Sequence, residues 1–167
     1  MSKRLAVARH AKSSWADPDL ADHERPLNAR GRRAATVVGR HLRDAGWVPD
    51  LVLCSSARRT CETLALFDLP TATDVLVEDR LYGVGASGLL ARLHAVPAGV
   101  GSVLLLAHNP GIEELARVLV DDSDALPEKF PTGAVAEVDL PISTWKDLRP
   151  HIGRLRRMLV PRELTGA

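Results

Sequence analysis

The chain is poor in several features that mark particular protein classes. Only two of its 167 residues are cysteines, Cys54 and Cys61, and their separation fits neither a zinc site nor a CxxC redox pair. We therefore expect two reduced thiols. No apolar run approaches the roughly 18 residues that a membrane-spanning helix needs, and no basic and apolar leader precedes the first predicted strand. These absences predict a cytoplasmic protein that does not bind membranes.

The chain also lacks an excess of one charge. It has 22 Lys and Arg against 21 Asp and Glu, a formal net charge of +1, which argues against a nucleic-acid-binding surface. The motifs GxxxxGK[ST], HExxH and GxSxG are absent. The sequence therefore gives no support to a P-loop nucleotide site, a zinc protease or a serine nucleophile on an elbow turn. Any anion site must be local.

Two predicted strands each run directly into a histidine. An apolar run that begins at Leu5 leads to His10, and a second that begins at Val103 leads to His108. In an open α/β sheet the carboxyl ends of parallel strands line one crevice. We therefore expect the two histidines to lie in the same pocket, where they would suit phosphoryl transfer.

The remaining pattern predicts a single α/β domain over residues 1–167. Helical spacing and capping residues predict helices that follow the strands, and alternating apolar and polar residues predict two half-exposed edge strands near the C-terminal end. The expected strands are 5–8, 51–54, 74–77, 102–107, 134–140 and 154–160, and the expected helices are 29–45, 55–67, 86–95 and 111–120. The predicted fold is a three-layer sandwich with a mainly parallel central sheet and helices on both faces.

Three arginines stand where the crevice is expected. Arg9 precedes His10, Arg25 lies in a long polar loop, and Arg59 lies at the start of the second helix, where Arg58 competes for the same role. Guanidinium groups offer paired donors that match phosphate oxygens, and helix N-termini add backbone N–H donors. The predicted phosphate ligands are Arg9, Arg25, Arg59, His108 and Asn109.

With these residues in this order, the chain resembles the histidine phosphatase superfamily, which includes the cofactor-dependent phosphoglycerate mutases, and within it the small SixA group of phosphohistidine phosphatases. The resemblance covers most of the chain. Four motifs carry it: Arg9-His10; Arg25-Pro26-Leu27 with Gly31; Ser55 with Arg59 and Thr63; and His108-Asn109-Pro110. The short length is also similar to SixA, because larger members insert helical segments over the site.

The resemblance implies a phosphatase that needs no metal ion or other cofactor. His10 would attack phosphorus in line and form a phosphohistidine intermediate that water hydrolyses. Arg9, Arg59 and a protonated His108 would hold the phosphate oxygens, with Arg25 as a further ligand. A neutral His10 would need an acceptor at its other ring nitrogen. The implied partner is a protein that contains phosphohistidine, or else a small phosphorylated molecule.

Two features depart from the family pattern. Ala11 stands where glycine usually follows the Arg-His pair, and the general acid has two adjacent candidates, Glu78 and Asp79. The resemblance implies that SixA-like members dispense with a strong acid because the P–N bond of phosphohistidine is labile. A weak acid would therefore favour phosphohistidine over phosphate esters.

Two other functions remain open at this point. A phosphomonoesterase for a sugar phosphate or a nucleotide would use the same residues and would depend on Glu78 or Asp79. A non-catalytic module that binds phosphorylated residues would use the same arginines without turnover. A mutase is disfavoured, because so short a chain has few residues to enclose a bisphosphorylated intermediate.

Overall fold

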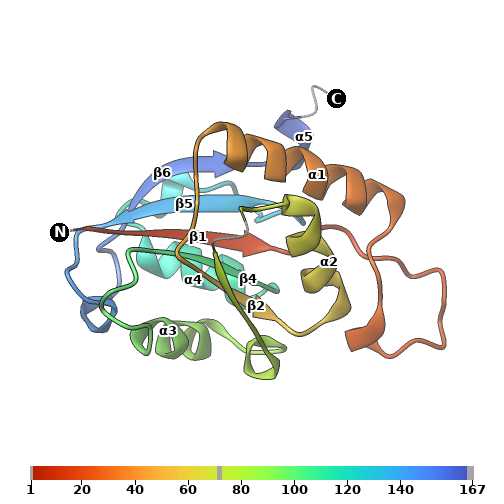
Figure 1. Cartoon of the computed structure of the whole chain (residues 1–167), viewed down its shortest axis with the longest axis horizontal. Helices are drawn as coiled ribbons and strands as arrows, with labels where there is room; N and C mark the ends of the chain where they lie inside the picture. The colour runs from red at the N-terminus through yellow and green to blue at the C-terminus, as the bar shows by residue number, and fades with distance from the viewer. Residues whose placement is uncertain (1, 71–72, 165–167) are drawn as a thin grey trace.

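The structure, a computed structural model, describes residues 2–70 and 73–164 and is organised around one mixed sheet (Figure 1). The six strands have the order β3-β2-β4-β1-β5-β6. Four parallel strands are β1 (Lys3–Arg9), β2 (Leu51–Ser55), β3 (Asp74–Glu78) and β4 (Ser102–Ala107), and two antiparallel strands are β5 (Val135–Leu140) and β6 (Arg154–Leu159). The mainly parallel sheet expected from the sequence is confirmed.

Helices follow the strands along the chain, as expected. They are α1 (Ala29–Asp44), α2 (Arg58–Phe67), α3 (Ala86–His94), α4 (Gly111–Leu119) and the short α5 (Pro161–Leu164), with 3-10 turns η1 (Asp22–Glu24), η2 (Asp79–Leu81), η3 (Ser123–Ala125) and η4 (Trp145–Asp147). The Asn28 side chain caps α1 by accepting from the Gly31 N–H at 2.7 Å. Gly46 follows the helix with a φ of 72°, a conformation that glycine adopts without strain. Among the described residues, no helix is both long and apolar enough to cross a bilayer.

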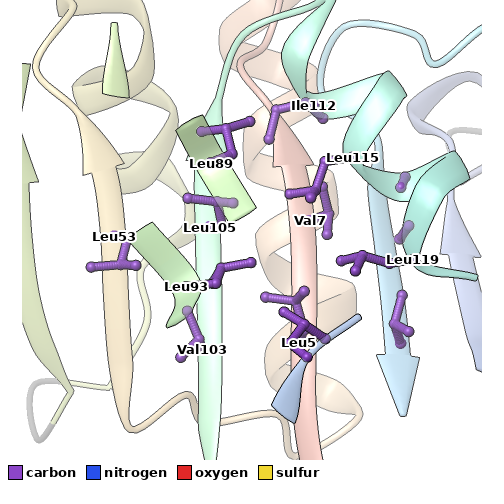
Figure 2. Close-up of a cluster of buried hydrophobic side chains, with 14 of the residues drawn as sticks. Leu5, Val7, Leu53, Leu89, Leu93, Val103, Leu105, Ile112, Leu115 and Leu119 are labelled. Carbon is purple, nitrogen blue, oxygen red and sulfur yellow. The ribbon is translucent and has the colours of Figure 1, made fainter. Parts of the chain in front are cut away.

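Alternate side chains of β1 belong to two separate hydrophobic cores, one on each face of the sheet. Leu5 and Val7 pack with residues of α3 and α4 on one face, as Figure 2 shows. Ala6 and Ala8 face the opposite core, which α1 and α2 cover. Because both faces of the central strands are buried, β1 and β4 need near-continuous apolar sequence. The three-layer arrangement expected from the sequence is therefore confirmed.

The C-terminal hairpin differs from the expectation in one respect. β6 is an edge strand, but β5 is an interior strand that pairs with both β1 and β6, and most of it is buried. Its alternating pattern is misleading because the polar Glu137 is itself buried and accepts a hydrogen bond from Arg157 of β6. A buried carboxylate with a cationic partner can occupy an interior strand. The prediction that both strands are half-exposed edges was wrong for β5.

The register between β1 and β4 positions the candidate site. Arg9 lies opposite Ala107 in the parallel ladder, so His10 and His108 leave neighbouring strands at the same level. The long loop that follows β1 extends beyond the carboxyl ends of the strands, at the right of Figure 1. This end of the sheet therefore gathers the polar segments that follow β1, β2 and β4.

Candidate active site

His10 and His108 lie side by side at the carboxyl ends of β1 and β4. Their ring centroids are 5.2 Å apart, and the two residues are only 7% and 9% exposed. The pairing joins residues from distant parts of the sequence in a partly enclosed site. It is the juxtaposition that strand ends in a parallel sheet produce.

The His10 ring is held as a neutral imidazole by one hydrogen bond, and its other nitrogen makes no hydrogen bond to any residue that the structure describes. Its Nδ1 lies 2.6 Å from the carbonyl oxygen of Ala11, and a carbonyl only accepts, so Nδ1 carries the hydrogen in this bond. Nε2 then bears a lone pair. Burial lowers the pKa of His10, the hydrogen bond to Ala11 opposes this, and the nearby His108, Arg59 and Arg9 add to the decrease, so that the pKa is about 3. The side chain is therefore a neutral imidazole at neutral pH.

Ala11 and Thr63 fix the backbone next to His10. The Thr63 hydroxyl accepts from the Ala11 N–H at 3.0 Å and donates to the Arg59 carbonyl at 2.7 Å. It therefore ties the segment after β1 to the helix that carries Arg59. The Ala11 methyl is buried in the core beneath α1. Where the family pattern has glycine, this chain thus has a methyl group that packs into the interior.

His108 is held by a residue of β2, the strand next to β4 on the side of the β3 edge. Ser55, the last residue of β2, has its hydroxyl 2.8 Å from His108 Nε2. Burial and then the charge of Arg59 lower the pKa of His108 to about 4. The protonated His108 implied by the resemblance is therefore not the form of the ligand-free site at neutral pH. A bound phosphate would raise this pKa, because an anion favours the protonated ring.

Arg9 and Asn109 share one backbone acceptor. The Nη1 of Arg9 and the side-chain amide of Asn109 both donate to the carbonyl oxygen of Phe130, at 3.0 and 3.1 Å. The amide oxygen of Asn109 accepts from the Glu113 N–H at the start of α4. Both ends of the Asn109 side chain are thus engaged in positioning the loop and capping the helix. The phosphate-ligand role expected for Asn109 has no support in this geometry.

Arg59 projects from the first turn of α2 and is held by Asp22 of the long loop. Its Nη1 donates to the Asp22 carbonyl at 2.7 Å, and its Nη2 donates to the Asp22 carboxylate at 3.0 Å. Arg58 points away and pairs with Glu62 at 2.9 Å on the exposed side of the helix. The structure therefore favours Arg59 over Arg58 as the arginine of this turn.

Arg25 reaches the same cluster through Asp22 rather than directly. Its Nη1 lies 2.9 Å from the other carboxylate oxygen of Asp22, and its remaining donors bind Ser13 and Ser14. The Trp15 ring stacks on the guanidinium at 3.2 Å and is 76% exposed on its other side. Asp22 thus bridges two cations that the sequence proposes as phosphate ligands.

Sequence reasoning missed Asp22 and Tyr82. The Tyr82 hydroxyl donates to the Asp22 carboxylate, and its ring contacts the rings of His108 and His23 edge-on. Hydrogen bonds from Tyr82 and then from Arg59 hold the pKa of Asp22 well below its ordinary range. One signal was available for Asp22, which stands three residues before Arg25, a spacing that suits an ion pair across one turn.

The two acid candidates stand where β3 meets η2. The Glu78 carboxylate pairs with Arg92 of α3 at 2.7 Å and with Arg80 at 3.0 Å. Partial burial would raise the pKa of Glu78, but hydrogen bonds from Arg92 and Arg80 outweigh it and lower this pKa well below its ordinary value. Asp79 is exposed at the start of η2. Glu78 therefore has no proton to give at neutral pH.

Sequence reasoning also missed three glycines that have the spacing of a dinucleotide-binding fingerprint. They do not lie directly between a strand and a helix as that fingerprint requires. Gly83, Gly85 and Gly88 follow the GxGxxG pattern, but η2 separates them from β3. That fingerprint needs its glycines directly between strand and helix. A Cβ on Gly111 of α4 would lie 2.5 Å from the Val84 carbonyl. The segment therefore serves the close packing of α3 against α4.

No metal-binding cluster accompanies these residues. Within residues 2–70 and 73–164, no three His, Cys, Asp or Glu side chains are grouped so that they could hold a metal ion. The site is instead a neutral imidazole surrounded by two arginines and a second histidine. Such a group of donors suits an anionic oxygen-rich ligand.

Comparison with known proteins agrees with this geometry. The family model described as histidine phosphatase superfamily (branch 1) matches residues 5–86. An uncharacterized protein of Mycobacterium tuberculosis is 36% identical over 163 residues, which cover 92% of this chain and 99% of the relative.

Solved structures of SixA proteins are similar over nearly the whole chain. The structure named as putative phosphohistidine phosphatase SixA from Nakamurella multipartitia is 33% identical, with a TM-score of 0.87 over 96% of this chain and 97% of that one. The protein histidine phosphatase SixA complexed with tungstate is 26% identical, with a TM-score of 0.77 over 96% of this chain and 99% of that one. The chain therefore belongs to the histidine phosphatase superfamily and, within it, to the SixA group.

Proposed function

We propose that the protein hydrolyses phosphohistidine in a protein substrate, with His10 as the nucleophile. The state of the His10 ring carries this proposal. Its Nδ1 donates to Ala11, its pKa is about 3, and its Nε2 is left to attack phosphorus. No base is needed to activate a nitrogen that is already unprotonated.

The reaction follows two balanced steps. In the first, His10 Nε2 forms a bond to phosphorus while the substrate P–N bond breaks, and its electron pair stays on the leaving imidazole, which takes a proton from water. In the second, water attacks the phosphoryl group on His10, the electron pair of the breaking bond returns to Nε2, and the proton that the attacking water loses neutralises the hydroxide left by the first step. Inorganic phosphate is released and the neutral ring is restored.

The basic residues around His10 would stabilise the transferred group. Arg9 and Arg59 present fixed guanidinium donors, and His108 becomes a cation as its pKa rises in the presence of phosphate. Phosphoryl transfer depends mainly on such positioning and charge stabilisation. We assign Arg25 a supporting role, because it reaches the cluster through Asp22.

The carboxylates near the site favour phosphohistidine over phosphate esters. Asp22 and Glu78 both have pKa values held below their ordinary range, so neither supplies a proton to a leaving group at neutral pH. An unactivated ester would lose the roughly 10²- to 10⁴-fold that general acid catalysis provides. The labile P–N bond of phosphohistidine has much less need of that proton.

The test is phosphate release from a phosphohistidine peptide and from an aryl phosphate, with wild-type protein and His10→Ala compared side by side. We expect faster release from the peptide and no turnover by the variant. A radiolabelled phosphoryl group should be trapped on wild type by rapid quenching and be absent from the variant.

The other outcomes would overturn the proposal in distinct ways. Equal or faster ester hydrolysis would assign the protein to the small-molecule phosphomonoesterases. Tight phosphate binding with no release from either substrate would indicate a module that binds phosphorylated residues. Turnover retained by a folded His10→Ala variant would remove His10 as the nucleophile.

A further inference from the structure

A large open groove begins at Arg9 and runs away from the histidine pair. Its volume is about 1190 Å³, and its walls are the first turns of α1, the segment 127–132 and the residues around α5. α5 lies next to α1 in Figure 1. The groove therefore connects the phosphate-binding end of the sheet with an outer surface of the molecule.

The groove is strongly basic. Seven Lys and Arg side chains line it, against two acidic ones, Glu128 and Glu163. The formal net charge of the whole chain is only +1. The positive charge is thus concentrated here and the remaining surface is net acidic. Clefts lined by one sign of charge attract ligands of the opposite sign.

Four of these cations are exposed and available. Lys12, Arg30, Arg33 and Lys129 are all exposed, and their side chains make no hydrogen bond or ion pair with any residue that the structure describes. By contrast, Arg32 donates to the Leu27 carbonyl. The four unpaired side chains come from three separate segments. They converge on one groove, and no side chain within the described residues pairs with them there.

We propose that this basic groove binds an acidic segment next to the phosphohistidine of the protein substrate, an inference that rests on the function proposed above. Arg9 lines the groove and also lies beside His10. A substrate chain whose phosphoryl group is at His10 would therefore enter the groove at Arg9. Aspartate and glutamate side chains flanking the phosphohistidine would pair with Arg30, Arg33 and Lys129.

The test uses two phosphohistidine peptides of equal length, one flanked by Asp and Glu and one by Ser and Gln. We expect wild type to show about tenfold higher kcat/KM for the acidic peptide at low salt, the lower end of electrostatic steering effects. This preference should decrease as salt is added. The charge-reversed variant Arg30→Glu/Arg33→Glu should lose it, while its kcat for an aryl phosphate stays unchanged.

A matched control carries the same charge change at the opposite end of the sheet. Lys146 and Arg149 are exposed in the connection after β5, whose last residue pairs with Lys3 at the start of β1. The control Lys146→Glu/Arg149→Glu should keep the preference for the acidic peptide. A control that loses the preference would show that net charge, not the groove, is responsible, and would overturn the proposal.

Failure of the groove proposal can be separated from failure of the proposed function. Equal hydrolysis of the two peptides by wild type would overturn the groove proposal and leave the function intact. If neither peptide is hydrolysed, fluorescence anisotropy with the unphosphorylated acidic peptide decides. Binding weakened about tenfold by Arg30→Glu/Arg33→Glu would support the groove, and equal binding would overturn it. Binding of tripolyphosphate but not of the acidic peptide would also overturn it.

Discussion

The Asp22 carboxylate and the Arg59 guanidinium form an ion pair at 3.0 Å inside the arginine cluster of the candidate site. Asp22 also pairs with Arg25 at 2.9 Å. A negative charge therefore lies next to Arg59, which we propose contacts the phosphate of a substrate, and next to Arg25, which supports the cluster. The pairing has two opposite effects, because it orients the guanidinium groups and also repels an incoming anion.

Asp22→Asn separates these two effects. The amide keeps an oxygen acceptor for the arginines but removes the charge, so we expect inorganic phosphate to bind severalfold more tightly, in keeping with the modest energies of partly exposed ion pairs. Asp22→Ala removes both, and we expect it to lower kcat. Product inhibition by phosphate measures the first effect and steady-state kinetics the second. Weaker phosphate inhibition of Asp22→Asn would show that orientation dominates.

Arg59→Ala should slow turnover by about a hundredfold or more, the usual size for loss of one preorganised donor to the transition state. The matched control is Arg58→Ala, which removes a guanidinium from the neighbouring position, where it pairs with Glu62 on the exposed side of the helix. Its kcat/KM should stay close to that of wild type. A larger loss of kcat/KM for Arg58→Ala than for Arg59→Ala would contradict the assignment of Arg59 as the functional arginine at the start of α2.

Glu78→Gln should lower stability and leave catalysis nearly intact. The substitution leaves the buried guanidinium of Arg92 without its charged partner, and removal of one member of a partly buried pair destabilises by about 1–3 kcal/mol. The kcat for a phosphohistidine peptide should change by less than about threefold, since no general acid is removed. Urea unfolding and phosphate release measure the two effects. A hundredfold loss of kcat in a folded variant would restore Glu78 as the acid.

The buried histidines predict a loss of stability below neutral pH. The pKa values of His10 and His108 are lowered to about 3 and about 4, so between pH 6.5 and pH 4 the unfolded chain binds more protons than the folded one. Stability therefore rises with pH across this window. From pH 7 to pH 5 each histidine should remove on the order of 2 kcal/mol from the free energy of unfolding.

Urea unfolding at the two pH values measures this loss, and the double variant His10→Gln/His108→Gln is the control. A glutamine has no proton to gain, so the variant should show a much smaller pH dependence. An equal loss in wild type and variant would mean that other groups cause the effect.

The sequence predicted the parts of the site that lie at strand ends. His10 and His108 follow apolar runs, and the ladder between β1 and β4 brings them to the same level. Periodicity and capping residues also predicted the main helices. These features depend on local sequence and on one general property of parallel sheets.

The sequence did not predict contacts made by the loops. Asp22 contacts Arg59, which is 37 positions away in the sequence, and Tyr82, which is 60 positions away. Helix and strand periodicity gives no information on contacts between residues so far apart in the sequence. β5 was misassigned for a related reason, since the ion pair that buries Glu137 depends on a residue of the next strand. Side-chain pairs between segments of irregular structure appear only when the segments are assembled.

The backbone N–H and the backbone C=O of Phe130 are both hydrogen-bonded to side chains of other segments. Its N–H donates to the Glu113 carboxylate at 2.6 Å, and its carbonyl accepts from Arg9 at 3.0 Å. Phe130 thus links the start of α4, through Glu113, to the guanidinium of Arg9. The segment 127–132, which forms a wall of the groove, is therefore anchored to the residue that precedes His10.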